Sequence, residues 1–261
     1  MVGQEVRQSL KKESGFFYGY FVVGASLLIM SMMWAVYYAF GVFFKPVLNE
    51  FEWTRAMTSG AFSLASIING LLTIAMGGLT DKFGPRMVMT FCGLLLGLGF
   101  ILMSQINALL HFYLFYGILV GAGMSGSFIP LISTVARWFL KRRGMMTGIV
   151  AAGSGIGALI GPPVASRLIP FYGWRISYVI LGSIVLAVVI LFAQFIKKDP
   201  SQVGQVAYGE NQIEQKRLNQ KVGGLSLREA VYTSQFWVFF PTGFCYGFCV
   251  FTIMVHIVPH A

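Results

Sequence analysis

Charged residues are scarce in this sequence: Asp, Glu, Lys and Arg make up 11 % of its 261 residues, and 56 % of the residues are hydrophobic. Soluble domains carry roughly 25 % charged residues, so this chain has too little polar surface to cover a water-facing globule. The same composition excludes intrinsic disorder, which requires low hydrophobicity. We therefore expect an integral membrane protein with the lipid bilayer as its main partner.

Cysteine is also rare. Cys92, Cys245 and Cys249 all lie inside apolar runs, where cysteine is a small core residue and no disulfide framework is indicated. A cleaved signal peptide is not indicated either, because the apolar run after Lys12 is too long for a signal.

Seven apolar stretches are long enough to cross the bilayer, which takes about 20 residues in a helix. They are 17–44, 56–79, 87–105, 109–136, 145–169, 176–196 and 236–259. Glycines recur every four residues at Gly117 and Gly121, and at Gly153, Gly157 and Gly161. Because small residues at this spacing let helix backbones approach closely in lipid, we expect an all-α bundle of packed spans.

The basic residues predict the orientation of the spans. The chain has a net charge of +10, but its basic residues are clustered between apolar runs and do not follow one solvated face. Nucleic acid is therefore not an expected partner. The richer connections should be cytoplasmic, which gives a multi-pass protein of the plasma membrane with a cytoplasmic N-terminus. This side includes a basic cluster of Arg137, Lys141, Arg142 and Arg143. The cluster is explained by topology, although Arg137 could also attract anions to the cytoplasmic mouth.

The connections also suggest a domain organisation. Residues 1–16 form a cytoplasmic tail, 17–196 a six-span bundle, 197–234 a polar cytoplasmic linker, and 235–261 the first span of a second bundle. A single span after a long linker has no partner half to pack against. We therefore expect a fragment, or a truncated reading frame, of a protein with about twice as many spans, which lacks its C-terminal half and is inactive alone.

A short sequence echo suggests an internal repeat. LTDKFGPR at 79–86 and LIPFYGWR at 168–175 both read Leu, three residues, an aromatic, Gly, any residue and Arg. They are predicted to lie on opposite membrane faces, as in the inverted three-plus-three repeat of many secondary transporters. A chance match is the alternative.

GGLTDKFGPR at 77–86 resembles the signature that joins the second and third spans in the major facilitator superfamily. The matching residues are Gly77, Asp81, Lys82, Gly84 and Arg86, and Pro85 departs from the pattern because a cation is usual there. Topology accounts for Lys82 and Arg86 but not for Asp81, since acids contribute little to orientation. The resemblance implies a conformational latch, in which Asp81 pairs with cations or a helix N-terminus in one state only.

A second resemblance lies in the fifth span. Gly148, Gly157, Gly161 and Pro162 have the spacing of the superfamily's antiporter motif, whose closing glycines are replaced here by Ala165 and Ser166. The glycines would form a close helix seam, and Pro162 with Pro163 would permit a bend. Generic glycine-rich packing explains the same residues.

Residues 136–163, ARWFLKRRGMMTGIVAAGSGIGALIGPP, resemble the monocarboxylate-transporter and oxalate/formate-antiporter branch of the superfamily, as do YGWR at 172–175 and VHIVPHA at the end. This resemblance implies a secondary active transporter that works by alternating access, with small organic anions such as monocarboxylates, oxalate or formate as substrates. A drug or a sugar is the alternative substrate, and a seven-span receptor is the alternative class. No enzyme, catalytic residue or cofactor is expected, and His256 with His260 lacks a third ligand for a metal.

The cavity of such a transporter would suit an anion. All nine acids lie in connections or at span ends, whereas an intramembrane carboxylate is the usual proton or cation site. The candidate substrate-binding residues are Trp34, Tyr37, Tyr38, Asn69, Tyr116, Ser125 and Ser154. Their donor groups could orient a carboxylate while the rings cover its apolar part. For Trp34 and Tyr38 an interfacial aromatic belt is the alternative.

Overall fold

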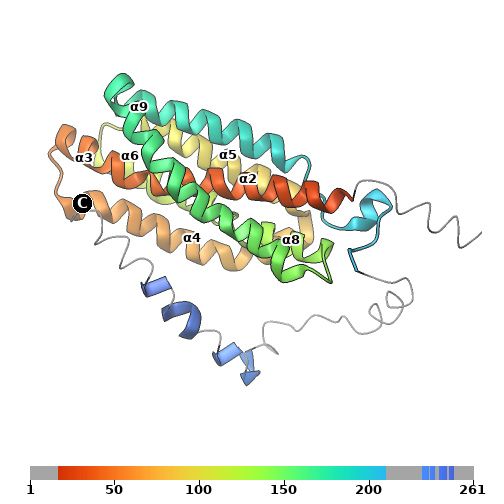
Figure 1. The fold of residues 1–261 in the computed structure, drawn as a ribbon. Helices are drawn as coiled ribbons and strands as arrows, with labels where there is room; N and C mark the ends of the chain where they lie inside the picture. The colour runs from red at the N-terminus through yellow and green to blue at the C-terminus, as the bar shows by residue number, and fades with distance from the viewer. Residues whose placement is uncertain (1–16, 210–230, 235, 239–240, 246, 250–261) are drawn as a thin grey trace, which may run out of the picture. The chain divides into compact units, whose positions relative to one another are not determined.

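The computed structural model describes residues 17–209, 231–234, 236–238, 241–245 and 247–249. The chain divides into two compact units, Met1–Glu210 and Asn211–Ala261. In the described part of the first unit the protein is helical, without a strand, and one isolated β-bridge joins Phe139 to Tyr208 (Figure 1). The described pieces of the second unit are short helical and turn segments.

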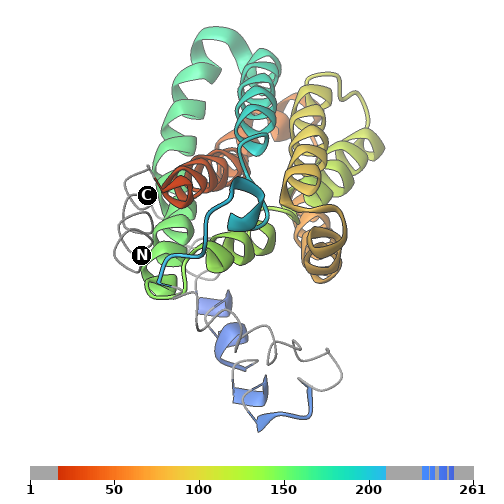
Figure 2. The same ribbon diagram turned by 90° about the vertical axis from the view of Figure 1, so that its right-hand side faces the viewer.

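The first unit consists of helices joined by short connections. They are α2 (Tyr18–Tyr38), α3 (Phe40–Phe51), α4 (Arg55–Phe83), α5 (Pro85–Met103), α6 (Leu109–Phe112), the π-helix η1 (Tyr113–Val120), α7 (Gly121–Met124), α8 (Ile129–Trp138), α9 (Arg143–Ala193) and the 3-10 helix η2 (Pro200–Val203). Helix α2 (red) lies beside both arms of α9 (green and teal) (Figure 2).

Five helical stretches in the described residues are long and apolar enough to cross a membrane, fewer than the seven predicted spans. They are Tyr18–Phe51, Arg55–Phe83, Pro85–Met103, Leu109–Trp138 and Arg143–Ala193. The last contains the predicted span 145–169 and residues 176–193 of the predicted span 176–196. Most of the predicted span at 236–259, with His256 and His260, lies outside the described residues.

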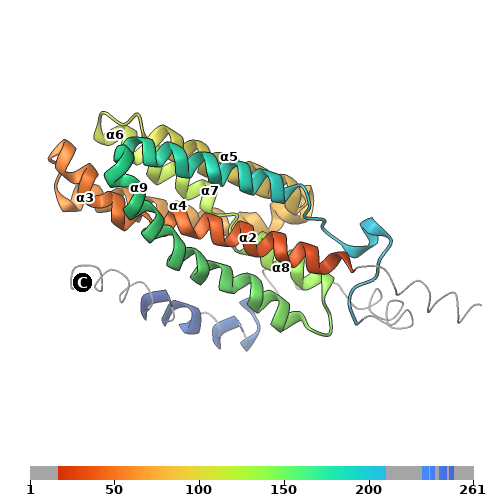
Figure 3. The same ribbon diagram turned by 45° about the horizontal axis from the view of Figure 1, so that its top comes forward.

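Helix α9 is interrupted at Gly173. A continuous helix of its 51 residues would be about 77 Å long, against about 30 Å of hydrocarbon. Gly173 has φ 76° and ψ 160°, a conformation open essentially to glycine alone. The chain reverses direction there (Figures 1 and 3), so we distinguish a first arm (143–172) and a second arm (174–193).

Gly84 makes the same kind of turn between α4 and α5, with φ 83° and ψ 158°. Its amide donates to the Thr80 carbonyl at 2.9 Å and so closes α4, and Pro85 follows as the first residue of α5. Gly84 and Gly173 occupy the same position in the sequence echo. The two halves of the echo therefore have the same backbone conformation at their shared glycine.

The first arm of α9 packs closely along α2 through glycines spaced four apart. A Cβ atom at Gly153 would lie 2.9 Å from the Leu27 carbonyl oxygen, and one at Gly157 would lie 2.5 Å from that of Ser31. A Cβ atom at Gly161 would likewise clash with the backbone carbonyl of Ala35. The predicted seam thus runs through Gly157 and Gly161 and includes Gly153.

The other two seam candidates do not contribute in this way. Gly148 has no atom within 4 Å of an added Cβ. At Pro162 the backbone keeps helical dihedral angles, and within α9 only Gly173 departs from them. The change of chain direction within α9 occurs at Gly173, eleven residues after Pro162.

We expect Gly157→Ala to lower the free energy of unfolding by about 1–3 kcal/mol, because the added methyl group overpacks the seam against α2. The measurement is detergent unfolding of the purified chain. Gly155→Ala is the matched control, because a Cβ at Gly155 has no atom within 4 Å and alanine favours the helix. Equal losses in the two variants would contradict the seam.

Candidate functional site

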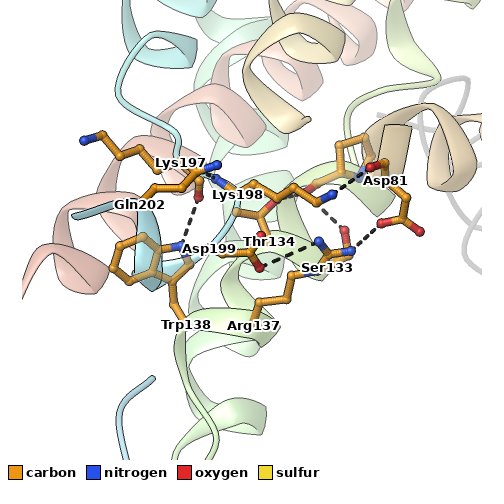
Figure 4. A network of polar contacts seen from close by, with 10 residues as sticks. Asp81, Ser133, Thr134, Arg137, Trp138, Lys197, Lys198, Asp199 and Gln202 are labelled. Carbon is orange, nitrogen blue, oxygen red and sulfur yellow. Dashed lines mark hydrogen bonds and ion pairs between the residues drawn. The ribbon is translucent and has the colours of Figure 1, made fainter. Parts of the chain in front are cut away.

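A polar network lies at the end of the bundle where α4 finishes, which we call the Asp81 end (Figure 4). Arg137 forms an ion pair with Asp81, and its other terminal nitrogen lies 3.9 Å from Asp199 Oδ1. Lys198 Nζ donates to the Asp81 carbonyl oxygen at 2.6 Å. The arginine therefore lies between two carboxylates that come from distant parts of the sequence.

Helix ends and a backbone bridge position these groups. Asp81 lies in the last turn of α4, and Arg137 in the last turn of α8. Asp199 precedes η2, and the chain beyond η2 is held by Tyr208, whose amide donates to the Trp138 carbonyl at 2.9 Å. The indole nitrogen of Trp138 donates to the Lys197 carbonyl at 3.0 Å. The segment after α9 is thereby fixed against the end of α8.

The other predicted latch residues have separate contacts. Arg86 Nε donates to Gln194 Oε1 at 2.6 Å, near the end of α9, and Lys82 Nζ lies 5.3 Å from the Phe83 ring centroid. A Cβ at Gly77 would only reach Ile129, at 3.8 Å, and Gly84 provides the turn described above. Asp81 and Arg86 are thus the two latch residues whose side chains contact a different span, and Asp81 is the one that does so through an ion pair.

The remaining residues of the basic cluster lie outside the ion pair. Arg142 lies over the Tyr208 ring at 5.7 Å, the amide of Lys141 donates to the Tyr208 carbonyl, and Arg143 begins α9 as an exposed residue. Sequence reasoning assigned Arg137 mainly to topology and did not name its partner. The unexplained acid Asp81 and the cation Arg137, predicted on the same membrane face, were the available signal.

A second polar clamp lies at the opposite end of the bundle, which we call the Glu50 end. Glu50 Oε1 accepts from Arg175 Nη2 at 2.7 Å, and Glu50 Oε2 accepts from the Trp174 indole at 2.6 Å. Arg175 Nη1 also donates to the carbonyls of Ser104 and Ile106, at 2.7 and 3.2 Å. This clamp ties α3, the end of α5 and the second arm of α9, and the sequence analysis missed it.

The aromatic substrate candidates lie together. The Trp34 ring centroid is 5.8 Å from that of Tyr37 and 5.2 Å from that of Tyr38. The Tyr37 hydroxyl lies 2.9 Å from Ser66 Oγ on α4. Phe40 contacts the Tyr116 ring at 4.7 Å and continues the aromatic cluster from α2 to η1.

Two donors of this cluster are buried without a hydrogen-bond partner in the described part of the chain: Trp34 Nε1 and the Tyr116 hydroxyl. Among the described residues, Ser26 Oγ and the Tyr178 hydroxyl are also buried without a hydrogen-bond partner. A buried donor left unpaired costs about 1–3 kcal/mol, so such groups require an explanation. A ligand that accepts hydrogen bonds would supply one.

The fourth membrane-crossing stretch is not a regular helix. It contains the π-helix η1, which carries Tyr116, and residues 125–128 between α7 and α8 are not helical. Thr73 Oγ1 donates to the carbonyl oxygens of Asn69, at 2.6 Å, and Ser125, at 3.3 Å. Irregular backbone at membrane depth is tolerated only where protein or a water-filled cavity surrounds it, and π-helical segments are frequent at functional sites.

Ser154 lies apart from the other candidates. Its hydroxyl donates to the Ala151 carbonyl of its own helix at 2.8 Å. Among the described residues no recorded hydrogen bond or ring contact connects it with the other six.

The sequence analysis also missed the break at 125–128, although GMSGS at 123–127 contains glycine and serine, which are poor helix formers.

Metal ligands do not converge in the described residues, where no group of three or more His, Cys, Asp or Glu could hold an ion. Cys92 is buried as a free thiol, and Cys245 and Cys249 are exposed free thiols.

The fold and the polar ends can now be compared with known proteins. The sequence matches the Major Facilitator Superfamily over residues 18–260. The chain belongs to this superfamily. The family prediction is therefore confirmed, and with its apolar helices the chain is an integral membrane protein.

Several relatives of this superfamily chain are transporters of organic acids by name. The oxalate:formate antiporter of Oxalobacter formigenes is 28 % identical over 241 residues, which cover 92 % of this chain and 55 % of the antiporter. Monocarboxylate transporter 13 of Bos taurus is 29 % identical over 172 residues, 66 % of this chain and 40 % of the relative. Monocarboxylate transporter 2 of Homo sapiens is 30 % identical over 175 residues, 65 % of this chain and 35 % of the relative. The chain thus spans about half the length of these relatives or less.

We expect Arg175→Lys to lower the free energy of unfolding by about 1–2 kcal/mol, because lysine cannot reach Glu50 and two carbonyls with one planar fork. This value is at the low end of the range for hydrogen bonds to charged groups, because both side chains are more than a third exposed and solvent screens the pair. Arg167→Lys, on the exposed first arm of α9, is the control and should leave unfolding unchanged. An unchanged Arg175→Lys would contradict the clamp.

A double-mutant cycle tests the ion pair at the Asp81 end. Asp81→Asn, Arg137→Gln and the double variant should give a coupling energy of about 0.5–1 kcal/mol in detergent unfolding. The coupling is small because the two side chains are 63 % and 33 % exposed. A cycle of Lys82→Gln with Arg137→Gln should give no favourable coupling, since Lys82 and Arg137 are both cations. Coupling equal in both cycles would contradict a specific pair.

Proposed function

We propose that residues 17–196 form one half of a secondary active transporter that moves small organic anions by alternating access. The bundle would have six spans and would cross the plasma membrane with a cytoplasmic N-terminus, so that the Asp81 end is cytoplasmic. Membership of the superfamily and the names of the relatives support a transporter of this kind. The excess of Lys and Arg at the Asp81 end supports the orientation.

The turn at Gly173 supports the count of six spans, because each arm of α9 is long enough to cross the bilayer core. An inverted repeat is supported by a correspondence between α5 and the second arm. Each follows a glycine of positive φ, and each carries an arginine two residues after that glycine. Arg86 reaches Gln194 at the end of the second arm, and Arg175 reaches Ser104 at the end of α5.

The two unpaired donors carry the choice of an anion as substrate. Trp34 Nε1 and the Tyr116 hydroxyl are buried in the aromatic cluster and donate to no described residue, and a carboxylate accepts such hydrogen bonds. The aromatic rings nearby would cover the apolar part of a monocarboxylate. No acid lies among the central residues of the proposed spans, so a carboxylate would meet no like charge there.

The ion pair of Asp81 with Arg137 would act as a latch between states. Alternating access requires a second bundle, which in the relatives could be supplied by the part of their length outside the match. Helix α4 offers a large apolar face to such a partner, since Ile67, Leu71 and Ile74 are 59–73 % exposed. Movement of that partner across the Asp81 end would favour one pairing of Asp81 over another.

The alternative within transport is another solute, such as a drug or a sugar. The two unpaired donors could also donate hydrogen bonds to such a solute. A seven-span receptor has less support, because the chain belongs to a transporter superfamily. The solute is therefore the property that an experiment must decide.

We expect the purified chain in nanodiscs to bind radiolabelled oxalate, formate or lactate saturably. Trp34→Phe and Tyr116→Phe should each weaken binding about tenfold or more, because each removes one hydrogen bond to a charged group. Tyr20→Phe is the control, since Tyr20 lies at the start of α2 and is 40 % exposed. In liposomes the chain alone should give no uptake above empty vesicles.

Different outcomes would contradict different parts of this proposal. Saturable binding of glucose or of a cationic drug, without binding of carboxylates, would refute the anion. Equal weakening by Tyr20→Phe would refute the role of the two donors. Uptake by the chain alone would refute its dependence on a second bundle.

A further inference from the structure

A cavity of about 270 Å³ lies at the Asp81 end, between the start of α5 and the segment that follows α9. One wall is formed by Phe83, Arg86 and Met87, and the facing wall includes Gln194, Lys197 and Lys198. A water molecule occupies about 30 Å³ of liquid, so the cavity has room for a phosphate group with part of its ester. It is separate from the aromatic cluster in the middle of the bundle.

The cavity is strongly basic. Arg86, Lys197 and Lys198 line it, and no carboxylate in the described residues forms an ion pair with any of them. The acids of this end, Asp81 and Asp199, are both engaged by Arg137. The first turn of the 19-residue helix α5 also opens onto the cavity and adds the partial positive charge of a helix N-terminus. Three cations thus share a cavity without a balancing anion.

The existing contacts leave these cations free to accept an anion. Arg86 uses only its Nε on the neutral Gln194, which leaves the terminal nitrogens as donors. Lys198 reaches across to the Asp81 carbonyl (Figure 4), and an ammonium group has two further donors. Lys197 Nζ lies 5.3 Å from the Tyr18 ring centroid, a cation–π contact.

An apolar surface begins at the mouth of the cavity. Met87, Phe91, Leu94 and Leu98 are 64, 61, 39 and 40 % exposed. Their spacing of four, three and four residues places them on one face of α5, and Met87 itself lines the cavity. A soluble phosphate ester would use only the basic cavity, whereas a phospholipid would use the cavity and this face together.

We propose that the cavity binds the headgroup phosphate of an anionic phospholipid, with its acyl chains along the Met87–Leu98 face of α5. Basic pockets between spans at the membrane surface bind such headgroups, each cation contributing favourably. A zwitterionic lipid binds less well, because its choline group is repelled by the same three cations. The site is independent of the proposed transport substrate and goes beyond the transport function.

The test is native mass spectrometry of the purified chain in neutral detergent with phosphatidylglycerol or phosphatidylcholine. Phosphatidylglycerol should bind more tightly, and Arg86→Gln with Lys198→Gln should weaken it about thirtyfold. The control, Lys141→Gln with Arg143→Gln, removes the same charge from the same end but outside the cavity, and should change binding by less than about threefold. Arg86→Lys with Lys198→Arg keeps the charge and should retain binding.

Further arms make the outcome decisive. Lys198→Gln alone should weaken phosphatidylglycerol about fivefold, which tests the site even where the double variant does not fold. Millimolar glycerol 3-phosphate should not displace the lipid; displacement would assign the cavity to soluble phosphate esters. Equal binding of the two lipids, or equal loss in the control, would overturn the proposal, since general surface charge would then explain the binding.

Discussion

Hydrocarbon solvates neither ionised side chains nor unpaired backbone groups, and this constraint organises the whole bundle. The charged residues of 17–209 lie at or near the two ends of the helices, where ion pairs tie different spans together. Arg137 joins α8 to α4, and Arg175 joins α9 to α3. Between the ends, where charge is excluded, the contact of α2 with α9 depends on glycines that admit the partner backbone.

The features that the sequence predicted are those that local pattern specifies. A glycine every fourth residue marks one helix face, so the seam at Gly157 and Gly161 could be expected before its partner was known. Asp81 stood out because topology gave it no role. The superfamily was identified from the same motifs, and the match over residues 18–260 confirms it.

The features that were missed depend on residues far apart in the sequence. Arg137 is 56 positions from Asp81, and Arg175 is 125 positions from Glu50, so neither pairing is specified by local spacing. The bend that Pro162 and Pro163 would permit stays a prediction, because the helical dihedral angles at these residues do not report the direction of the helix axis.

The two turns at Gly84 and Gly173 have the same backbone but different electrostatic surroundings. Arg175 has the carboxylate of Glu50, while the corresponding Arg86 has only the amide of Gln194. The acid nearest to Arg86 in sequence, Asp81, is taken by Arg137. This difference leaves Arg86 without a carboxylate partner among the described residues, beside Lys197 and Lys198 in the basic cavity.

Lys198 connects that cavity to the ion pair. Its ammonium group donates to the Asp81 carbonyl and also lines the cavity, so a bound phosphate and the end of α4 share one cation. Two sites that share a group influence each other equally in both directions. A phospholipid that draws Lys198 into the cavity would loosen the end of α4, and a movement of Asp81 away from Arg137 would change the affinity for the lipid by the same factor. The composition of the membrane would then act on the proposed latch through a single side chain.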